Sequence, residues 1–359
     1  MRVTHVDYYL CNQFMREGTV NGPEYPEPRW DLVPKYFIQV HTDAGITGIG
    51  ETPRGVKEDA VVAGAQALIG RDPLTLPLEN LPLPRNGAFM AYEIALFDIV
   101  GKAQGKRVVD LLGGAVRDRV AVDWWSGRRT PDDLARWAKE GWDRGFRGIK
   151  IKCTIQDPMV ERVRRCYETV PEMKMTIDPN CRFYRAEDTL ELARQLQQYP
   201  NVACFEDPIP KDDLRAYAAL HRAMQDTGIP LRLHLGSIEQ LRQALDLECI
   251  DIVNCSPPSM VTFVEMARMA GEAGIPCWHG SGNDCGILDL AYVHCCAAAP
   301  ACTHPSDIMG NILHVDDFLV EPIRFEGGDA LVPDRPGLGG ELDMAAVERY
   351  LIARGRVEG

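Results

Sequence analysis

Four short apolar segments in the middle of the chain each end at or near a reactive polar residue, and they recur at a nearly constant spacing. The polar residues are Lys152, Asp178, Glu206 and His234, which follow one another at intervals of 26 to 28 residues. Segments with helical patterns lie between them. A strand-plus-helix unit that repeats at this interval is typical of a parallel β/α barrel.

The carboxyl ends of the strands of such a barrel meet at one face, where catalytic groups gather. A lysine, an aspartate, a glutamate and a histidine that arrive together at this face indicate a metal ion and a base. The 359 residues exceed what one small core needs and fit two domains, one of which can be a full barrel.

The alternation of strands and helices begins near Val120. We expect barrel strands at residues 120–125, 147–152, 173–178, 202–206, 230–235, 250–254 and 276–279, and an eighth, less regular strand near 318–322. The intervening helices are predicted to begin after Pro131, Asp157, Ala186, Asp212, Ser237, Ser259 and Gly286, and several of these residues suit a helix start.

Residues 1 to 118 have a different pattern. Strands are predicted at 3–10, 36–42 and 46–51, and helices at 57–69 and 88–103. Strands that precede helices, instead of alternating with them, predict an α+β unit. Residues 324–359 hold a glycine-rich segment and a terminal helix, and we expect this tail to return to the first unit.

The composition excludes several classes of protein. A net charge of −13 argues against a general nucleic-acid binder, which needs a basic surface. No apolar run approaches the roughly 18 residues of a membrane span, and the N-terminus has no signal-peptide pattern. The 12 cysteines are scattered without zinc-type pairs, which predicts small core residues in a reducing cytoplasm.

Five motifs, in this order and at this spacing, carry a resemblance to a known family. They are Ile94–Lys102, Gly148–Lys152 with its Lys-x-Lys pattern, Asp178-Pro179-Asn180, Glu206-Asp207-Pro208 and Pro336–Glu341. Each motif is weak alone. Together they resemble the enolase superfamily, specifically its mandelate racemase/muconate lactonizing enzyme group, over nearly the full length.

The resemblance implies an α/β fold: a modified TIM barrel, (β/α)7β, with an N-terminal α+β capping domain completed by the C-terminal tail. We therefore expect the cap at residues 1–118, the barrel at 119–323 and the returning segment at 324–359. It also implies Mg²⁺-dependent abstraction of the proton α to a substrate carboxylate. A divalent cation lowers that barrier because it stabilises the negative charge of the enediolate.

The motifs assign roles by carry-over. Lys152, the second lysine of its motif, is expected to be the base, with Lys150 as an electrostatic helper. Asp178 and Glu206 are expected to bind the metal. The third ligand of the family is usually acidic, whereas this chain has His234, at a place where one relative has asparagine. Imidazole suits Zn, Mn or Fe better than Mg²⁺, so another divalent metal is an alternative.

The wall opposite Lys152 also departs from the family pattern. Muconate-lactonizing types carry a lysine on the sixth strand, where this chain has Val253-Asn254-Cys255-Ser256. Racemase and glucarate dehydratase types use a histidine from the seventh strand paired with an aspartate from the sixth. His279 is a candidate for that catalytic acid, but Asp251 falls too early in its strand to be its partner.

Further residues are expected to contact the substrate from strand ends and from the cap loop at 16–30. They are Asn180, Trp125, Ser281, Asn283, Asp284 and Arg16, and Arg29 of the same loop is an alternative to Arg16.

We expect a lyase that dehydrates a sugar acid or a related hydroxy acid, because one base suffices for elimination. The alternative is a racemase, epimerase or cycloisomerase that uses Lys152 and His279 on opposite faces of the α-carbon. A third possibility is a non-catalytic relative. In each case the expected partner is a small carboxylate, with no nucleic acid or membrane, in a homo-oligomer.

Overall fold

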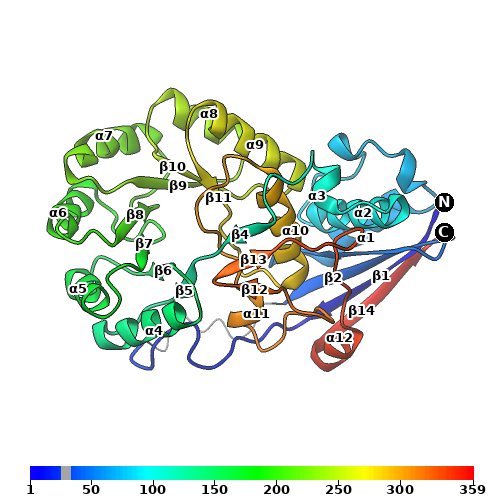
Figure 1. Cartoon of the computed structure of the whole chain (residues 1–359). Coiled ribbons are helices and arrows are strands. Elements are labelled where there is room, and N and C mark those ends of the chain that lie inside the picture. Colours follow the sequence, from blue (N-terminus) through cyan, green and yellow to red (C-terminus); the bar gives the residue numbers. More distant parts are fainter. Residues whose placement is uncertain (26–33) are drawn as a thin grey trace.

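The computed structural model describes residues 1–25 and 34–359, and Arg29 lies outside them. Figure 1 shows a barrel ringed by helices on one side and, on the other, a sheet that carries both termini. The arrangement is the α/β fold expected from the sequence.

The barrel sheet has seven parallel strands in the order β11-β10-β9-β8-β7-β6-β5. Its strands are β5 (Trp124–Ser126), β6 (Gly148–Lys152), β7 (Lys174–Asp178), β8 (Val202–Glu206), β9 (Leu231–Leu235), β10 (Ile252–Cys255) and β11 (Cys277–Trp278). The helices that follow them are α4 (Pro131–Asp143), α5 (Met159–Thr169), α6 (Ala186–Leu196), α7 (Leu214–Met224), α8 (Ile238–Asp246), α9 (Met260–Glu272) and α10 (Gly286–Ala298). The helix starts agree with the predicted ones.

Alternation along each strand decides which side chains face the barrel interior. In β6, Ile149 and Ile151 join the large core cluster beneath the helices, so Lys150 and Lys152 point to the other side, into the barrel. The same period places Asp178 and Glu206 inside, at the last residues of β7 and β8. The short period-2 pattern of the sequence therefore fixes the lining of the mouth.

The barrel closes through residues 302–307 and not through the predicted strand at 318–322. Cys302 forms a parallel bridge with Cys277 of β11, and Ser306 forms another with Val122. Residues 318–322 instead make one antiparallel bridge, between Leu319 and Leu342. The closing segment contains Pro305, which cannot donate a ladder hydrogen bond, so it pairs only at isolated residues.

The first predicted barrel strand, at 120–125, is two strands with different partners. Arg119–Ala121 forms β4, which pairs antiparallel with β13 (Asp329–Leu331) in a three-stranded sheet with β12 (Phe325–Glu326). The barrel strand β5 begins only at Trp124. Trp124 and Trp125 therefore start the barrel strand, whereas the sequence placed them at its end.

The cap contains an antiparallel sheet in the order β14-β1-β2-β3. Its strands are β1 (Val3–Cys11), β2 (Lys35–Thr42), β3 (Thr47–Glu51) and β14 (Leu351–Glu358). The remaining elements are the helices α1 (Glu58–Leu68), α2 (Phe89–Gln104), α3 (Val108–Leu111), α11 (Gly310–Leu313) and α12 (Met344–Tyr350), and the short 3₁₀ segments η1 (Pro73–Thr75), η2 (Leu78–Asn80) and η3 (Gln225–Thr227). The tail returns to the cap as predicted, and it does so by adding β14 beside β1.

Buried carboxylates of the cap bind the amino ends of barrel helices. Glu51 accepts hydrogen bonds from the backbone N–H groups of Cys285 (2.8 Å) and Leu288 (3.0 Å), at the start of α10. Glu93 accepts from Ser259 Oγ (2.8 Å) and Met260 N (2.6 Å), at the start of α9. The first N–H groups of a helix have no partner within the helix, so these contacts satisfy them and join the cap to the barrel.

The structure also bears on the state of the cysteines and on membrane-spanning helices. All 12 cysteines are free thiols and 11 of them are buried, which confirms that they serve as small core residues. Among the described residues, no helix has both the length and the apolar character that a membrane span requires.

Candidate active site

A small apolar cluster packs inside the barrel beside the charged residues of the mouth. Cys204, Ile252 and Trp278 form a separate buried cluster contributed by β8, β10 and β11. The indole ring of Trp278 supports two cations, because Lys150 Nζ lies 4.5 Å and the Arg232 guanidinium 4.3 Å from its centroid. The charged groups above are therefore held on a rigid floor.

Lys150 lies at the centre of a carboxylate cluster. Its ammonium contacts Asp307 Oδ2 at 2.9 Å, Glu206 Oε1 at 3.1 Å and Asp178 Oδ2 at 3.2 Å. Lys152 makes a direct ion pair with the same Asp178 oxygen. The side chain of Lys150 is 3% exposed and that of Lys152 is 17% exposed, so Lys152 is the one that a bound molecule can reach.

These contacts set the protonation of the cluster. Burial alone would lower the pKa of Lys150, but the three carboxylates hold it well above its ordinary value. Burial would raise the pKa of Asp178, but the ammonium groups of Lys152 and Lys150 hold it below its usual range. Burial raises the pKa of Glu206 to about 7 against the pull of Lys150. The contacts therefore favour the ammonium form of Lys150 and the carboxylate form of Asp178.

Asn254 of β10 lies on the wall where the family resemblance implied a possible lysine. Its Nδ2 donates to Glu206 Oε1 (3.0 Å), and its Oδ1 accepts from Ser256 Oγ (2.8 Å) and Gly280 N (2.9 Å). A side chain at Gly280 would meet Asn254 at 2.1 Å, so glycine is needed for this close approach. Asn254 thus orients Glu206 and contributes no base.

A cavity of about 180 Å³ opens above this cluster. Ten of the residues proposed from the sequence line it: Lys150, Lys152, Asp178, Glu206, His234, Asn180, Trp125, Ser281, Asn283 and Asp284. Residues that the sequence did not propose also line it: Arg54, Asn254, Gly280, Gly282, Asp307, Met309, Gly310, Leu313 and His314.

Two proposed residues do not line the cavity. His279 is buried behind it, with its ring stacked on that of Tyr292 (3.3 Å between centroids). Its Nε2 lies 3.3 Å from Asp284 Oδ2, so the partner of His279 is five residues later in the chain, while Asp251 pairs with His221. Arg16 donates from Nε to the backbone oxygen of His314 (2.6 Å) and supports the cavity wall from outside.

The missed residues had weak sequence signals. Asp307 belongs to the closing segment, which lacks the apolar run of a strand. Arg54 follows Pro53 in the turn after β3, and nothing in that turn indicates contact with the barrel. Only the docking of the cap brings Arg54 to the mouth.

Asp178, Glu206 and His234 are two carboxylates and one imidazole, which are chemical types that bind divalent cations. Oε2 of Glu206 is buried and accepts no hydrogen bond from the described residues; the Arg232 guanidinium lies 3.8 Å from it. Burial and the ammonium groups of Lys211 and Lys150 lower the pKa of His234 to about 3, so its imidazole is neutral and can donate a lone pair. The ligand atoms of these three residues do not all lie within 4.8 Å of one another, as those of one cap cluster do.

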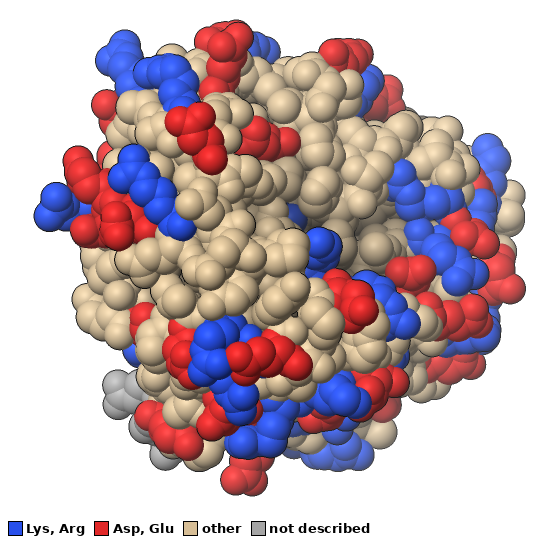
Figure 2. Space-filling model, turned by 60° about the vertical axis from the view of Figure 1, so that its left-hand side comes forward, with Lys and Arg blue, Asp and Glu red and all other residues tan. Residues whose placement is uncertain are grey.

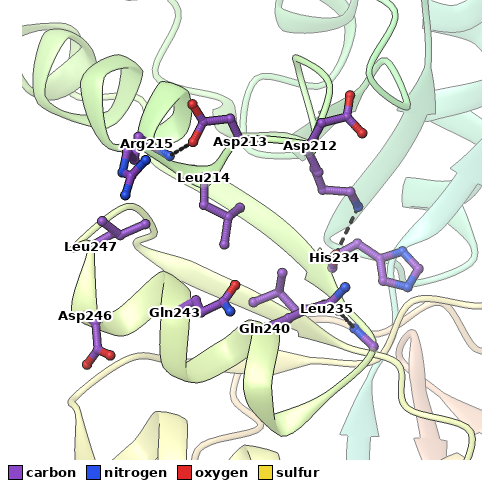
Figure 3. Close-up of a pocket in the computed structure, with 12 residues that line it drawn as sticks. Asp212, Asp213, Leu214, Arg215, His234, Leu235, Gln240, Gln243, Asp246 and Leu247 are labelled. Carbon is purple, nitrogen blue, oxygen red and sulfur yellow. Dashed lines mark hydrogen bonds between the residues drawn. The ribbon is translucent and has the colours of Figure 1, made fainter.

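His234 also separates the cavity from a larger outer groove of about 660 Å³. This groove lies between the amino end of α7 and the length of α8, and it is lined by Asp212, Asp213 and Asp246 among others. In Figure 3 the imidazole of His234 points away from Leu214 and Gln243, which line the groove. The groove lacks the lysine and carboxylate cluster, so the smaller cavity is the candidate site.

The outer surface has no single electrostatic character on the face drawn in Figure 2. Acidic and basic side chains alternate around the rim, and the face is hollowed near its middle, where uncharged residues prevail.

Family models match both parts of the chain. A model described as mandelate racemase/muconate lactonizing enzyme, N-terminal domain, matches residues 33–113. A model described as enolase C-terminal domain-like matches residues 133–346, which is more than half of the chain.

Curated relatives align over most of their length. N-succinylamino acid racemase of Thermus thermophilus is 30% identical, over 86% of this chain and 87% of its own. Muconate cycloisomerase 1 of Rhodococcus opacus is 27% identical over 88% and 91%, and arabinonate dehydratase of Saccharolobus solfataricus is 27% identical over 87% and 89%.

Solved structures share the fold. The crystal structure of N-succinyl Arg/Lys racemase from Bacillus cereus superposes over 100% of both chains with a TM-score of 0.86 at 23% identity. The chain belongs to the enolase superfamily, in its mandelate racemase/muconate lactonizing enzyme group.

Proposed function

We propose that this protein abstracts the proton α to a carboxylate of a small acid, with a bound divalent metal ion. The observation that carries the proposal is the cluster at the barrel mouth, where the partly exposed Lys152 lies beside the buried group of Lys150, Asp178 and Glu206. Enediolate chemistry requires a basic amine beside a site that can bind a metal cation.

Asp178, Glu206 and His234 would hold the metal. We take Mg²⁺ as the first candidate, since the family uses it and two of the donors are carboxylates, and another divalent ion as the alternative because of the imidazole. When bound, the metal stabilises the negative charge that develops on the substrate carboxylate.

The two lysines have different tasks. Lys150 is sealed among three carboxylates and remains an ammonium, so it offers charge and a hydrogen bond without accepting a proton. Lys152 lines the cavity and reaches the substrate side, so it takes the α-proton. Lys152 can do so only when its amine is neutral, which requires that Asp178 be engaged elsewhere.

Dehydration of a sugar acid or related hydroxy acid is the reaction we favour. One base suffices for elimination, and the wall opposite Lys152 presents Asn254 and Ser281 in place of a second lysine. Side-chain amides and hydroxyls such as these bind the hydroxyl groups of a polyhydroxy acid. The relative named arabinonate dehydratase supports this choice.

Racemisation, epimerisation or cycloisomerisation is the second candidate, because the other relatives are named as racemases or cycloisomerases. Such a reaction would use His279 as the second acid or base. The His279–Asp284 pair supports it, but the stacked ring would have to leave Tyr292 to reach the cavity.

Incubation of the Mg²⁺-loaded protein with a panel of sugar acids and N-acylamino acids in D₂O tests the proposal. A keto acid that reacts with semicarbazide indicates dehydration, and deuterium at the α-carbon with retained hydroxyls indicates isomerisation. Lys152→Ala should lower either activity by about 10³-fold or more. If the variant and its parent behave alike on every acid, the chain is a non-catalytic relative.

A further inference from the structure

Two histidines and an aspartate gather on the open face of the cap sheet, away from the barrel mouth. His5 of β1 and His41 of β2 are direct partners across the antiparallel ladder, and Asp7 lies two residues beyond His5 on the same face. The opposite face carries Val6 and Tyr8 into the core formed with α1 and α2. The register therefore places three metal-binding side chains together by strand geometry alone.

The three side chains direct their free atoms toward one point. Asp7 Oδ2 lies 3.3 Å from Nε2 of His41 and 3.9 Å from Nε2 of His5. Among the described residues, this is the only group of three histidine, cysteine or acidic side chains with all ligand atoms within 4.8 Å of one another. Two ligands of a tetrahedral Zn²⁺, each 2.0–2.1 Å from it, are roughly 3.3 Å apart, so the cluster is close to that geometry.

Neighbouring threonines prepare both imidazoles. The hydroxyl of Thr4 lies 2.9 Å from Nδ1 of His5, and that of Thr47 lies 3.1 Å from Nδ1 of His41. An Nδ1–H that is hydrogen-bonded leaves Nε2 with its lone pair, the form in which histidine binds metals. Nε2 of His41 is buried and makes no hydrogen bond with any described residue.

The cluster lies near the surface of the cap sheet. The side chains of His5 and His41 are 28% and 23% exposed and that of Asp7 is 12% exposed, so the cluster is close to solvent. The two imidazole rings are stacked and nearly parallel, with centroids 4.3 Å apart.

Arg356 of β14 is the other partner of Asp7. Its Nε donates to Oδ1 (2.6 Å) and its terminal nitrogen to Oδ2 (3.0 Å). An ion that takes Oδ2 displaces the second contact and leaves the first, which then orients the carboxylate as hydrogen-bond partners of metal ligands commonly do.

We propose that His5, Asp7 and His41 form a second metal site, on the cap, that binds a borderline divalent transition-metal ion such as Zn²⁺ through two imidazole nitrogens and one carboxylate oxygen. Two nitrogen donors select against Mg²⁺, so the cap site and the barrel site differ in the ion they take. The ion ties β1 to β2 and does not touch the substrate cavity.

Zn²⁺ binding to the full chain tests the site, by equilibrium dialysis and metal analysis after treatment with a chelator. Glu206→Gln serves as the background, because it weakens the barrel site. On that background we expect one Zn²⁺ per chain, and His41→Gln should weaken its binding more than tenfold. His221→Gln is the matched control, because His221 also pairs with an aspartate (Asp251, 2.9 Å) but belongs to no cluster of three.

A second readout guards against misfolding. Zn²⁺ should raise the midpoint of thermal unfolding of the parent and of His221→Gln, but not that of His41→Gln, while all three unfold alike in chelator. Equal Zn²⁺ binding by the parent and by His41→Gln, or no binding by the Glu206→Gln background, would overturn the proposal.

Discussion

Buried carboxylates occur in two regions of this molecule, and their partners differ. In the cap, Glu51 and Glu93 accept hydrogen bonds from backbone N–H groups at the starts of barrel helices, and Glu51 also pairs with the buried ammonium of Lys35. At the barrel mouth, Asp178 and Glu206 contact lysine ammonium groups, and one oxygen of Glu206 accepts no hydrogen bond from the described residues. Both regions hide the same chemical group from water.

The difference separates stability from chemistry. A backbone N–H cannot leave its helix, and the Lys35 that pairs with Glu51 is fully buried, so the cap carboxylates are held in fixed places. At the mouth Lys152 is partly exposed and one oxygen of Glu206 is unsatisfied within the described part of the chain, so a lysine can move and an oxygen can take a new ligand. The mouth therefore has polar atoms that are free to bind a ligand. Functional sites commonly keep such atoms unsatisfied at some cost in stability.

The largest effect on activity is expected when a mouth carboxylate is neutralised. Glu206→Gln should lower kcat/KM at least about 100-fold, because the amide binds a metal ion poorly. The midpoint of thermal unfolding should stay within a few degrees of the parent, since Asn254 can still donate to the amide oxygen. Steady-state kinetics and calorimetry measure the two quantities. If Glu206→Gln keeps the activity of the parent, the carboxylates of the mouth do not serve the chemistry.

The matched change in the cap, Glu51→Gln, should lower the stability of the protein more than its activity. Glu51→Gln removes the nearer counter-charge of the fully buried Lys35, now at 2.8 Å, and among the described residues leaves it only Asp284 at 3.8 Å; it also places an amide donor against a backbone N–H. Breaking a buried ion pair costs about 3–5 kcal/mol of unfolding free energy. Denaturant titration measures this loss. The double variant with Lys35→Met should be less destabilised than the sum of the single changes, and strict additivity would show that the pair is not coupled.

Glu93 should give the cap a pH dependence of stability. Burial raises the pKa of Glu93 from 4.5 to about 7, so the folded state binds its proton more tightly than the unfolded state does. The resulting stabilisation is complete below about pH 4.5 and is lost as the pH rises through 7, a change of about 3 kcal/mol. Unfolding curves of the parent and of Glu93→Gln between pH 4.5 and 8 measure it. Parallel pH profiles would refute the assignment.

The smallest effect is expected at Arg16. Its exposed guanidinium supports the backbone of His314 with one short hydrogen bond, so Arg16→Ala should cost about 1 kcal/mol of stability and change KM less than about threefold. Arg54→Ala is the comparison, because Arg54 lines the cavity. A KM for Arg16→Ala that rises more than that of Arg54→Ala would restore Arg16 as a substrate contact.

The fold was predictable wherever a local pattern carried it. The barrel helices after Pro131, Ser237 and Ser259 begin as their caps predict. The closing segment at 302–307 was not predictable, because it pairs only at isolated residues and has no apolar run. The strand β14 was also missed, since Leu351–Glu358 alternates only weakly and depends on β1 for its pairing.

Some residues of the candidate site were predictable from the sequence and others were not. The Lys-x-Lys motif occupies five residues of β6, so the family resemblance implied the lysine pair from the sequence. Asp307 contacts Lys150 across 157 residues of chain, and such a contact leaves no local signal. His279 was placed on the correct strand, but its burial against Tyr292 depends on how α10 packs on the barrel.

By itself the sequence determined the family, the order of the barrel units and the inward pair Lys150 and Lys152, because spacing and period-2 alternation act over a few residues. Only the tertiary structure decided that Asp307 completes the cluster, that Arg54 reaches the mouth from the cap, and that His5, Asp7 and His41 meet on a separate face. Those arrangements come from strand register and domain docking, which join residues far apart in the chain and depend on the packing of the whole molecule.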